Sequence, residues 1–192
     1  MTQQIAPSKS AAAEGRWTYE RYLRETVDGE YFTIIGGEKI VLPSPTSFHQ
    51  AILGNLCLSL QDWVRQSSAG KLILRPFDVV LSRDEVTQPD LIFVLTQHLV
   101  RLGEKNFQGA PDLVIEILSP GSVQLDRVKK RELYARHGVP EYWIVSPGER
   151  TVEIWRLQGE QYELVHVYEE AETLSSPLLT DFSCAVKDIF VE

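Results

Sequence analysis

The strongest constraint on how this chain can fold is a pair of Pro-Asp dipeptides, each of which opens a short apolar run. The two runs span 89–95 and 111–118 and are rich in β-branched residues. Runs of this kind are typical of strands that are buried on both faces, and they are too apolar to be solvated edge strands. We therefore predict two neighbouring strands in the core of one sheet.

Glu116 lies inside the second run, between Ile115 and Ile117. A carboxylate in such surroundings costs free energy to bury unless it is paired or binds a cation. Asp112 shares its strand face, but four residues at about 3.3 Å each put the two carboxylates about 13 Å apart, too far to share one ion. Asp90 opens the neighbouring run and is the better partner. For both aspartates the alternative stays open that a Pro-Asp pair merely begins a strand.

A helix is predicted from residue 47 onward. Ser47 and Gln50 have the spacing of a capping box, and apolar residues recur at near-helical intervals between 48 and 63. His49 lies in the first turn of this helix. Its imidazole could contact a substrate or a catalytic carboxylate, or it could simply form hydrogen bonds at the helix start, and the sequence leaves both interpretations open.

Glycine and proline divide the rest of the chain into elements. Gly36 and Gly37 separate two β-rich runs and predict a hairpin that ends at Pro43 and Pro45, and Gly138 stops a helix. The hairpin strands are predicted at 31–35 and 38–42. The remaining predicted elements are a strand at 72–82 that Pro76 either bends or marks as an edge strand, a helix at 126–137, a strand at 142–145, and hairpin strands at 151–157 and 162–167.

The helix predicted at 126–137 carries the best local patch of positive charge for contact with phosphate. The patch consists of Arg127, Lys129, Lys130, Arg131 and Arg136, followed by His137. Charge runs are usually solvated helix faces, and that alternative stays open for this patch. Adjacent residues on a helix point about 100° apart, so Lys129 and Lys130 cannot face one site equally.

Five segments of the chain match motifs of a known family. They are 109–120, 126–134 and 138–145, together with 48–50 and 88–90. In these segments the chain resembles the PD-(D/E)XK nuclease superfamily and, within it, the Uma-two family of restriction endonucleases, formerly a domain of unknown function. The resemblance covers about residues 17–190. It implies an α/β (α+β) fold with a restriction-endonuclease-like mixed β-sheet flanked by helices.

The resemblance also implies a metal site. Mg²⁺, for which Mn²⁺ can substitute, would be held by Asp90, Glu116 and the backbone carbonyl of Ile117. The superfamily lysine usually lies two residues after the second carboxylate, where this chain has Leu118. Lys130 on the following helix is then the catalytic lysine beside the two carboxylates. The residues implied to bind substrate or to support the site are His49, Gln88, Asp112, Arg127 and Tyr134.

Length and composition agree with one compact domain. The 192 residues are enough to bury a core, no apolar run approaches the roughly 20 residues of a membrane span, and no signal peptide is evident. We expect a disordered tail at 1–15 and a single cytoplasmic, nuclease-like domain at 16–192. Cys57 and Cys184 lack the spacing of a metal site and are interpreted as buried thiols.

The net charge and the missing motifs narrow the function. A net charge of −8 argues against a protein that coats nucleic acid nonspecifically, although phosphate contacts of a nuclease can be local. The sequence has no Gly-x-Ser-x-Gly elbow, no Walker loop and no Cys-x-x-Cys. Two hypotheses remain. The first is a Mg²⁺-dependent DNA endonuclease, expected to be a homodimer because cutting both strands needs two sites. The second is a catalytically weak or inactive nuclease-derived module that binds DNA or a protein.

Overall fold

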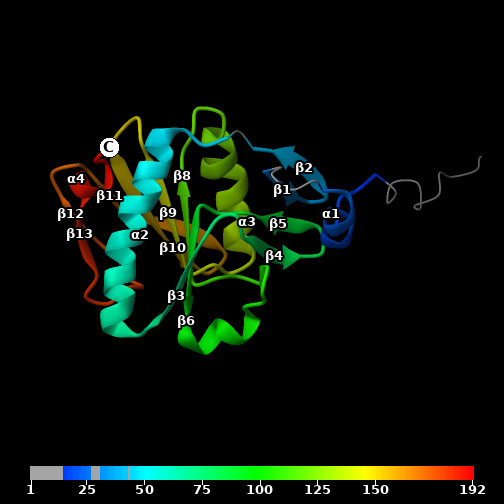
Figure 1. Ribbon diagram of the computed structural model, residues 1–192, viewed down its shortest axis with the longest axis horizontal. Coiled ribbons are helices and arrows are strands. Elements are labelled where there is room, and N and C mark those ends of the chain that lie inside the picture. The colour runs from blue at the N-terminus through cyan, green and yellow to red at the C-terminus, as the bar shows by residue number, and fades with distance from the viewer. Residues whose placement is uncertain (1–14, 27–30, 43) are drawn as a thin grey trace, which may run out of the picture.

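The computed structural model describes residues 15–26, 31–42 and 44–192 (Figure 1). The tail predicted at 1–15 lies outside the described residues except for Gly15. Pro43, which is predicted to end the first hairpin, also lies outside them.

A mixed six-stranded sheet forms the centre of the molecule. In spatial order its strands are β11 (Gln161–Tyr168), β10 (Thr151–Gln158), β9 (Glu141–Ser146), β8 (Leu113–Ile117), β6 (Leu91–Leu95) and β3 (Gly70–Leu74). β6 and β8 pair antiparallel, whereas β8 and β9 pair parallel. The two apolar runs that follow the Pro-Asp dipeptides are β6 and β8, so their prediction as neighbouring core strands is confirmed.

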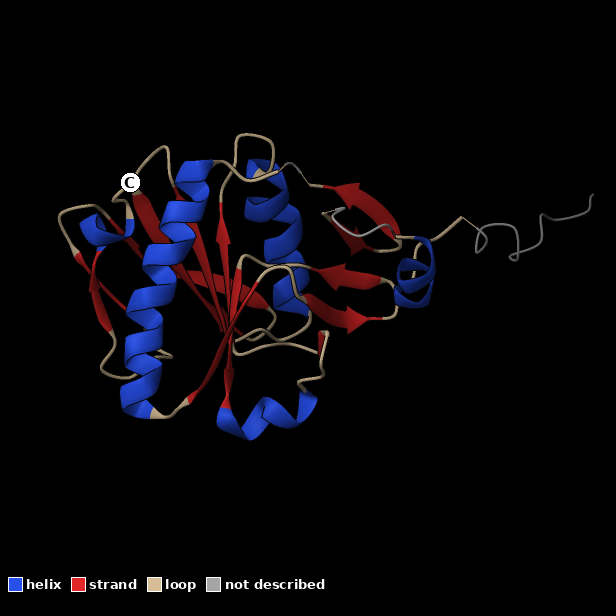
Figure 2. Cartoon of the chain, viewed as in Figure 1, coloured by secondary structure: helices blue, strands red, loops and turns tan. Residues whose placement is uncertain are grey.

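Helices cover both faces of this sheet (Figure 2). α2 (Ser47–Ser67) packs on one face, against a cluster that includes Ile115 and Ile117 of β8. α3 (Arg131–Arg136) packs on the other face, against a cluster that includes Val114. Alternate strand residues point to opposite faces, which is why one strand supplies both clusters. The predicted α/β (α+β) class, a mixed sheet flanked by helices, is confirmed.

The start of α2 differs from the prediction by one residue. Thr46 is the N-cap, and its side-chain oxygen accepts a hydrogen bond from the backbone N–H of His49 at 3.2 Å. Ser47 is instead the first residue of the helix, so the predicted capping box is wrong. The chain offers two adjacent hydroxyl residues here, and the sequence does not show which one adopts the extended backbone that a cap requires.

A second, five-stranded sheet lies to one side of the first, together with the short helix α1 (Tyr19–Glu25) (Figure 1). In spatial order its strands are β2 (Glu38–Val41), β1 (Phe32–Ile35), β5 (Glu85–Thr87), β4 (Asp78–Ser82) and β7 (Asn106–Gln108). β1 and β2 form the predicted hairpin, in which Gly36 and Gly37 have φ values of +58° and +80°. Positive φ at both turn positions is the reason for the glycine pair.

The single strand predicted at 72–82 is wrong. The chain forms β3, leaves the central sheet around Pro76, and then forms β4 in the second sheet. Proline has no N–H to donate to a strand ladder, so the residue taken as a bend in one strand marks the passage between two sheets.

The helix predicted at 126–137 is present in two parts. The π-helical segment η2 (Leu125–Lys130) runs directly into α3, and Gly138, with φ +79°, follows the helix end as predicted. Short π-helical segments occur frequently at functional sites. The segment widens the helix where Asp126 and Lys130 are buried.

The remaining elements close the ends of the core. They are the 3₁₀ helix η1 (Thr96–Arg101), the strand pair β12 (Thr173–Ser175) and β13 (Ser183–Ala185), and α4 (Val186–Ile189). Cys57 and Cys184 are both free thiols; Cys184 is buried as expected, whereas Cys57 is only partly buried. In the part of the chain that the structure describes, none of the helices combines the length and the apolar character needed to cross a membrane.

Candidate active site

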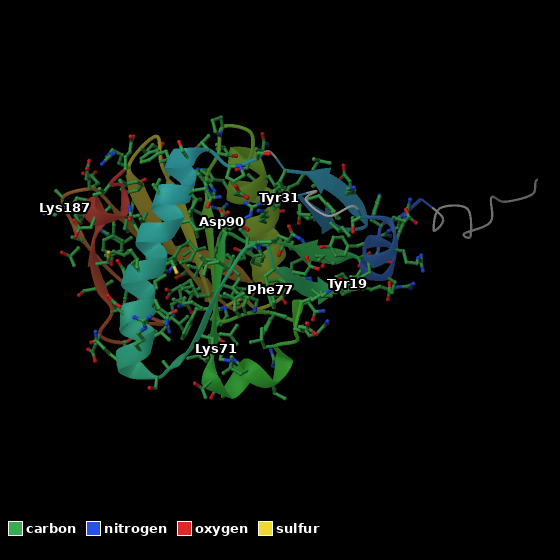
Figure 3. All side chains as sticks on the ribbon, viewed as in Figure 1. Tyr19, Tyr31, Lys71, Phe77, Asp90 and Lys187 are labelled. Carbon is green, nitrogen blue, oxygen red and sulfur yellow. The ribbon has the colours of Figure 1, made fainter. Side chains whose placement is uncertain are left out.

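The strand register places Asp90 beside Glu116. Leu91 of β6 is paired with Ile115 of β8, and Ile92 with Val114. Continuing this antiparallel register by one residue puts Asp90 opposite Glu116, on the same face of the sheet. Both carboxylates line one cavity of about 30 Å³, together with side chains from four other segments. Figure 3 shows Asp90 between α2 and the β1–β2 hairpin, toward the opposite end of the sheet from Lys71.

Asp90 is held by three donors. Its Oδ2 accepts a hydrogen bond from the backbone N–H of Ile117 at 2.8 Å and lies 3.3 Å from Nε2 of His49. Its Oδ1 accepts a hydrogen bond from Nη1 of Arg75 at 2.8 Å. Burial alone would raise the pKa of Asp90, but His49, Arg75 and the Ile117 N–H outweigh it and lower that pKa. Asp90 is therefore ionised at neutral pH although only 2% of it is exposed.

Lys130 is buried between two carboxylates. Its Nζ lies 2.9 Å from Oε1 of Glu116 and 2.9 Å from Oδ1 of Asp126. Burial lowers the pKa of Lys130, but the charges of Asp126 and Glu116 outweigh burial and raise it. The side chain thus stays an ammonium ion at the cavity wall. Lys129 is exposed, which agrees with the prediction that only one of the two lysines reaches the site.

Glu116 is the carboxyl group of the cavity whose protonation state changes near neutral pH. Burial raises its pKa to about 7, and the charges of Asp126 and Asp90 act in the same direction against the opposing effect of Lys130. Tyr134, one helical turn after Lys130, donates a hydrogen bond of 2.7 Å to Oε1 of Glu116. Tyr134 is itself fully buried, and burial next to that carboxylate raises its pKa well above the ordinary value. The tyrosine hydroxyl therefore stays protonated and acts as a hydrogen-bond donor to Glu116.

Three of the predicted supporting residues neither line the cavity nor form a hydrogen bond or ion pair with any described side chain that lines it. Gln88 donates hydrogen bonds to Oδ1 of Asp78 and to the hydroxyl of Tyr22. Asp112 accepts a hydrogen bond from the backbone N–H of Leu95 and pairs with His98, near the other end of β6. Arg127 pairs with Glu149 and Glu153. Asp112 shares the strand face of Glu116 but lies four residues away along β8, and the side chains of Gln88 and Arg127 are engaged with other partners.

Two charged residues of the cavity, Asp126 and Arg75, were not predicted as site residues. Asp126 lies four residues before Lys130, and this helical spacing is a signal that could have identified it. Arg75 follows β3, and its backbone N–H donates a hydrogen bond to the carbonyl of Asp90 at 3.2 Å. No sequence signal marks Arg75, because its position depends on the pairing of β3 with β6.

The donor atoms are suited to a hard divalent cation. Among the described residues no three His, Cys, Asp or Glu side chains gather as a metal site on their own. The carboxylates of Asp90, Glu116 and Asp126 nevertheless all line the same cavity, and Oδ1 of Asp126 lies 2.9 Å from Nζ of Lys130. Carboxylate and carbonyl oxygens are the ligands that Mg²⁺ and Mn²⁺ prefer, and backbone or water oxygens can complete the set. The residues present therefore fit such an ion.

Comparisons with known proteins agree with this geometry. No curated protein matches the chain. A solved structure described as "a putative nuclease belonging to DUF820" from Anabaena variabilis ATCC 29413 is similar, with a TM-score of 0.77 and 25% sequence identity. The similarity covers 91% of this chain and 97% of that chain. The model of the Uma2 family, described as "Putative restriction endonuclease", matches residues 18–187. Because the family model matches most of the length of the chain, the chain belongs to the Uma2 family and is a hydrolase of the nuclease type.

Proposed function

We propose that this protein is a DNA endonuclease that hydrolyses phosphodiester bonds with the help of a divalent metal ion, Mg²⁺ or Mn²⁺. The observation that carries the proposal is the burial of Lys130 against Glu116 in the same small cavity as Asp90. Two carboxylates and an ammonium ion around a cavity with room for about two waters are the groups that metal-assisted attack on a phosphate requires.

Residues in and beside the cavity have distinct roles in this proposal. Asp90 and Glu116, with the carbonyl of Ile117, would hold the metal ion, which when bound lowers the pKa of a water ligand and offsets charge on the phosphate. Lys130 orients that water and supplies positive charge. Tyr134 fixes the carboxylate of Glu116 by its hydrogen bond. His49 and Arg75 keep Asp90 ionised and in place.

A nuclease-derived module that binds DNA or protein without cutting is the second candidate. It is favoured by Leu118, an aliphatic side chain at the position where the superfamily usually has its lysine. It is also favoured by the engagement of Lys130 with two carboxylates, because a lysine held in this way must leave one of them to reach a substrate.

Cleavage of supercoiled plasmid and of bacterial genomic DNA, with Mg²⁺, Mn²⁺ or EDTA, separates the two candidates. We expect cleavage only with metal, and we expect Glu116→Gln to abolish it. Glu104→Gln is the matched control, because Glu104 is exposed and lies outside the cavity. DNA left intact by the wild type with either metal would favour the second candidate.

The proposal includes a homodimer as the acting unit. One cavity can cut one strand at a time, so a double-strand break requires two protomers or two binding events. Sedimentation velocity on the protein with and without DNA measures the oligomeric state. A species that stays monomeric on DNA while producing linear plasmid directly would contradict the dimer.

A further inference from the structure

A second, larger cavity lies on the outer side of α3. It has a volume of about 510 Å³, within the range of small-molecule pockets, and it lies between α3 and the β10–β11 hairpin. Arg131 and Arg136 line it from the helix, and Trp155 and Tyr162 line it from the strands. Arg131 follows Lys130 directly, so the helix carries the small catalytic cavity on one side and this cleft on another.

Arg131 is the distinctive residue of the cleft. Its guanidinium carbon lies 4.5 Å from the centre of the Trp155 ring, in a cation–π contact. It makes no ion pair or hydrogen bond with any residue that the structure describes. A guanidinium group carries five N–H donors in its plane, and stacking against a ring leaves these edges available. The Arg131 guanidinium thus rests against the Trp155 ring while the donors at its edges remain open to an anion.

The other residues define what kind of anion fits. Arg136 is engaged with Glu85 at 2.7 Å, which leaves Arg131 as the main anchor for negative charge. Glu132 and Glu160 also line the cleft and are exposed, and their charges oppose a ligand with several negative groups. The cleft is much larger than a bare anion needs, and the aromatic rings of Trp155 and Tyr162 favour a planar apolar body.

We propose that this cleft binds a nucleotide that carries a single phosphate. The phosphate accepts hydrogen bonds from the edge of Arg131, and the base lies against the stacked Arg131 and the aromatic side chains of the cleft. Arginine planes and aromatic rings are common surfaces for stacking of unpaired bases. The same chemistry occurs in a free deoxynucleoside monophosphate and in one nucleotide unit of a DNA strand.

The test is isothermal titration calorimetry in EDTA with the full-length chain. The probes are dAMP, deoxyadenosine, dATP and a short single-stranded oligodeoxyadenylate. EDTA removes any contribution of metal and cleavage, so the result does not depend on the proposed endonuclease activity. We expect saturable binding of dAMP, and weaker binding of both deoxyadenosine, which lacks the phosphate, and dATP, which adds negative charge.

Two substitutions locate the binding. Arg131→Gln should weaken dAMP binding by about tenfold or more, since it removes a charged hydrogen-bond donor. Arg65→Gln is the matched control and should leave binding unchanged, because Arg65 lies on α2, which packs on the opposite face of the central sheet, and is exposed. Trp155→Phe keeps a ring under Arg131 and should give an intermediate loss. Circular dichroism melts show whether each variant is folded.

The outcomes separate the two sources of the ligand. Tighter binding of the oligonucleotide than of dAMP, lost in Arg131→Gln, would identify the cleft as a contact for a DNA strand. Binding of dAMP without binding of the oligonucleotide would identify a site for free nucleotides. No saturable binding of either probe at millimolar concentration, or equal binding by folded Arg131→Gln, would overturn the proposal and leave the proposed endonuclease untouched.

Discussion

The ammonium group of Lys130 lies 2.9 Å from Oε1 of Glu116, and both side chains are almost completely buried. A buried ion pair of this kind is a weak source of stability, because removing two charges from water costs about as much as their attraction returns. The position of this pair at the wall of the small cavity fits a catalytic role better than a structural one.

Replacement of Lys130 by methionine should affect stability and cleavage far more than the same replacement of Lys129. Lys130→Met leaves Glu116 and Asp126 without their shared cation, and we expect the free energy of unfolding at pH 8 to fall by about 3–5 kcal/mol. Cleavage should be lost by at least about a hundredfold. Lys129→Met should change stability by less than about 0.5 kcal/mol, since Lys129 is exposed. Urea denaturation and plasmid cleavage measure the two effects. Cleavage that survives in Lys130→Met and is lost in Lys129→Met would show that the wrong lysine has been chosen.

Stability should depend on pH through Glu116. Its pKa is about 7 in the folded protein against 4.5 as the ordinary value, so the folded state binds more protons between these pH values. Stability from this group is therefore complete below pH 4.5 and is lost as the pH rises through about 7. The loss is on the order of 3 kcal/mol.

Comparison with Glu116→Gln isolates that dependence. The amide does not titrate, so the stability difference between variant and wild type should shift in favour of the variant as the pH rises from 4.5 to 7.5. Urea denaturation at several pH values gives this difference. A difference that stays constant over the range would mean that Glu116 titrates normally.

Divalent metal should stabilise the fold. An ion that binds only the native state adds about 2.7 kcal/mol at a hundredfold excess over its Kd, which appears as a rise in Tm. It also relieves the repulsion between Glu116 and its neighbouring carboxylates. The rise should be absent in Glu116→Gln and present in Glu104→Gln. A wild-type Tm that stays the same when millimolar Mg²⁺ or Mn²⁺ is added would argue against a metal site.

Loss of the Tyr134 hydroxyl should weaken the position of Glu116. Tyr134→Phe removes a hydrogen bond to a buried carboxylate, and we expect a loss of about 1–3 kcal/mol in stability at pH 8 together with slower cleavage. Tyr168→Phe is the matched control, because that hydroxyl binds Ser175 at an exposed position. If both variants unfold at the wild-type urea concentration, the hydrogen bond contributes nothing measurable.

The sequence by itself determined the elements that carry local signals. The Pro-Asp runs predicted β6 and β8 because two-sided burial requires uninterrupted apolar side chains, and the glycine pair predicted the first hairpin because only glycine adopts positive φ without strain. Lys130 and Tyr134 follow from helical spacing together with the family motif. Glu116 could be identified from the sequence because it is a single carboxylate among apolar neighbours in the chain.

Only the tertiary structure decided which distant residues share the cavity. Arg75 reaches Asp90 because β3 pairs with β6, and no local sequence pattern predicts that pairing. Asp112 begins its strand with the same dipeptide as Asp90, yet it lies near the opposite end of β6 and binds His98, because β6 and β8 run antiparallel. Strand direction and register are set by packing between segments far apart in the chain, and local patterns do not contain them.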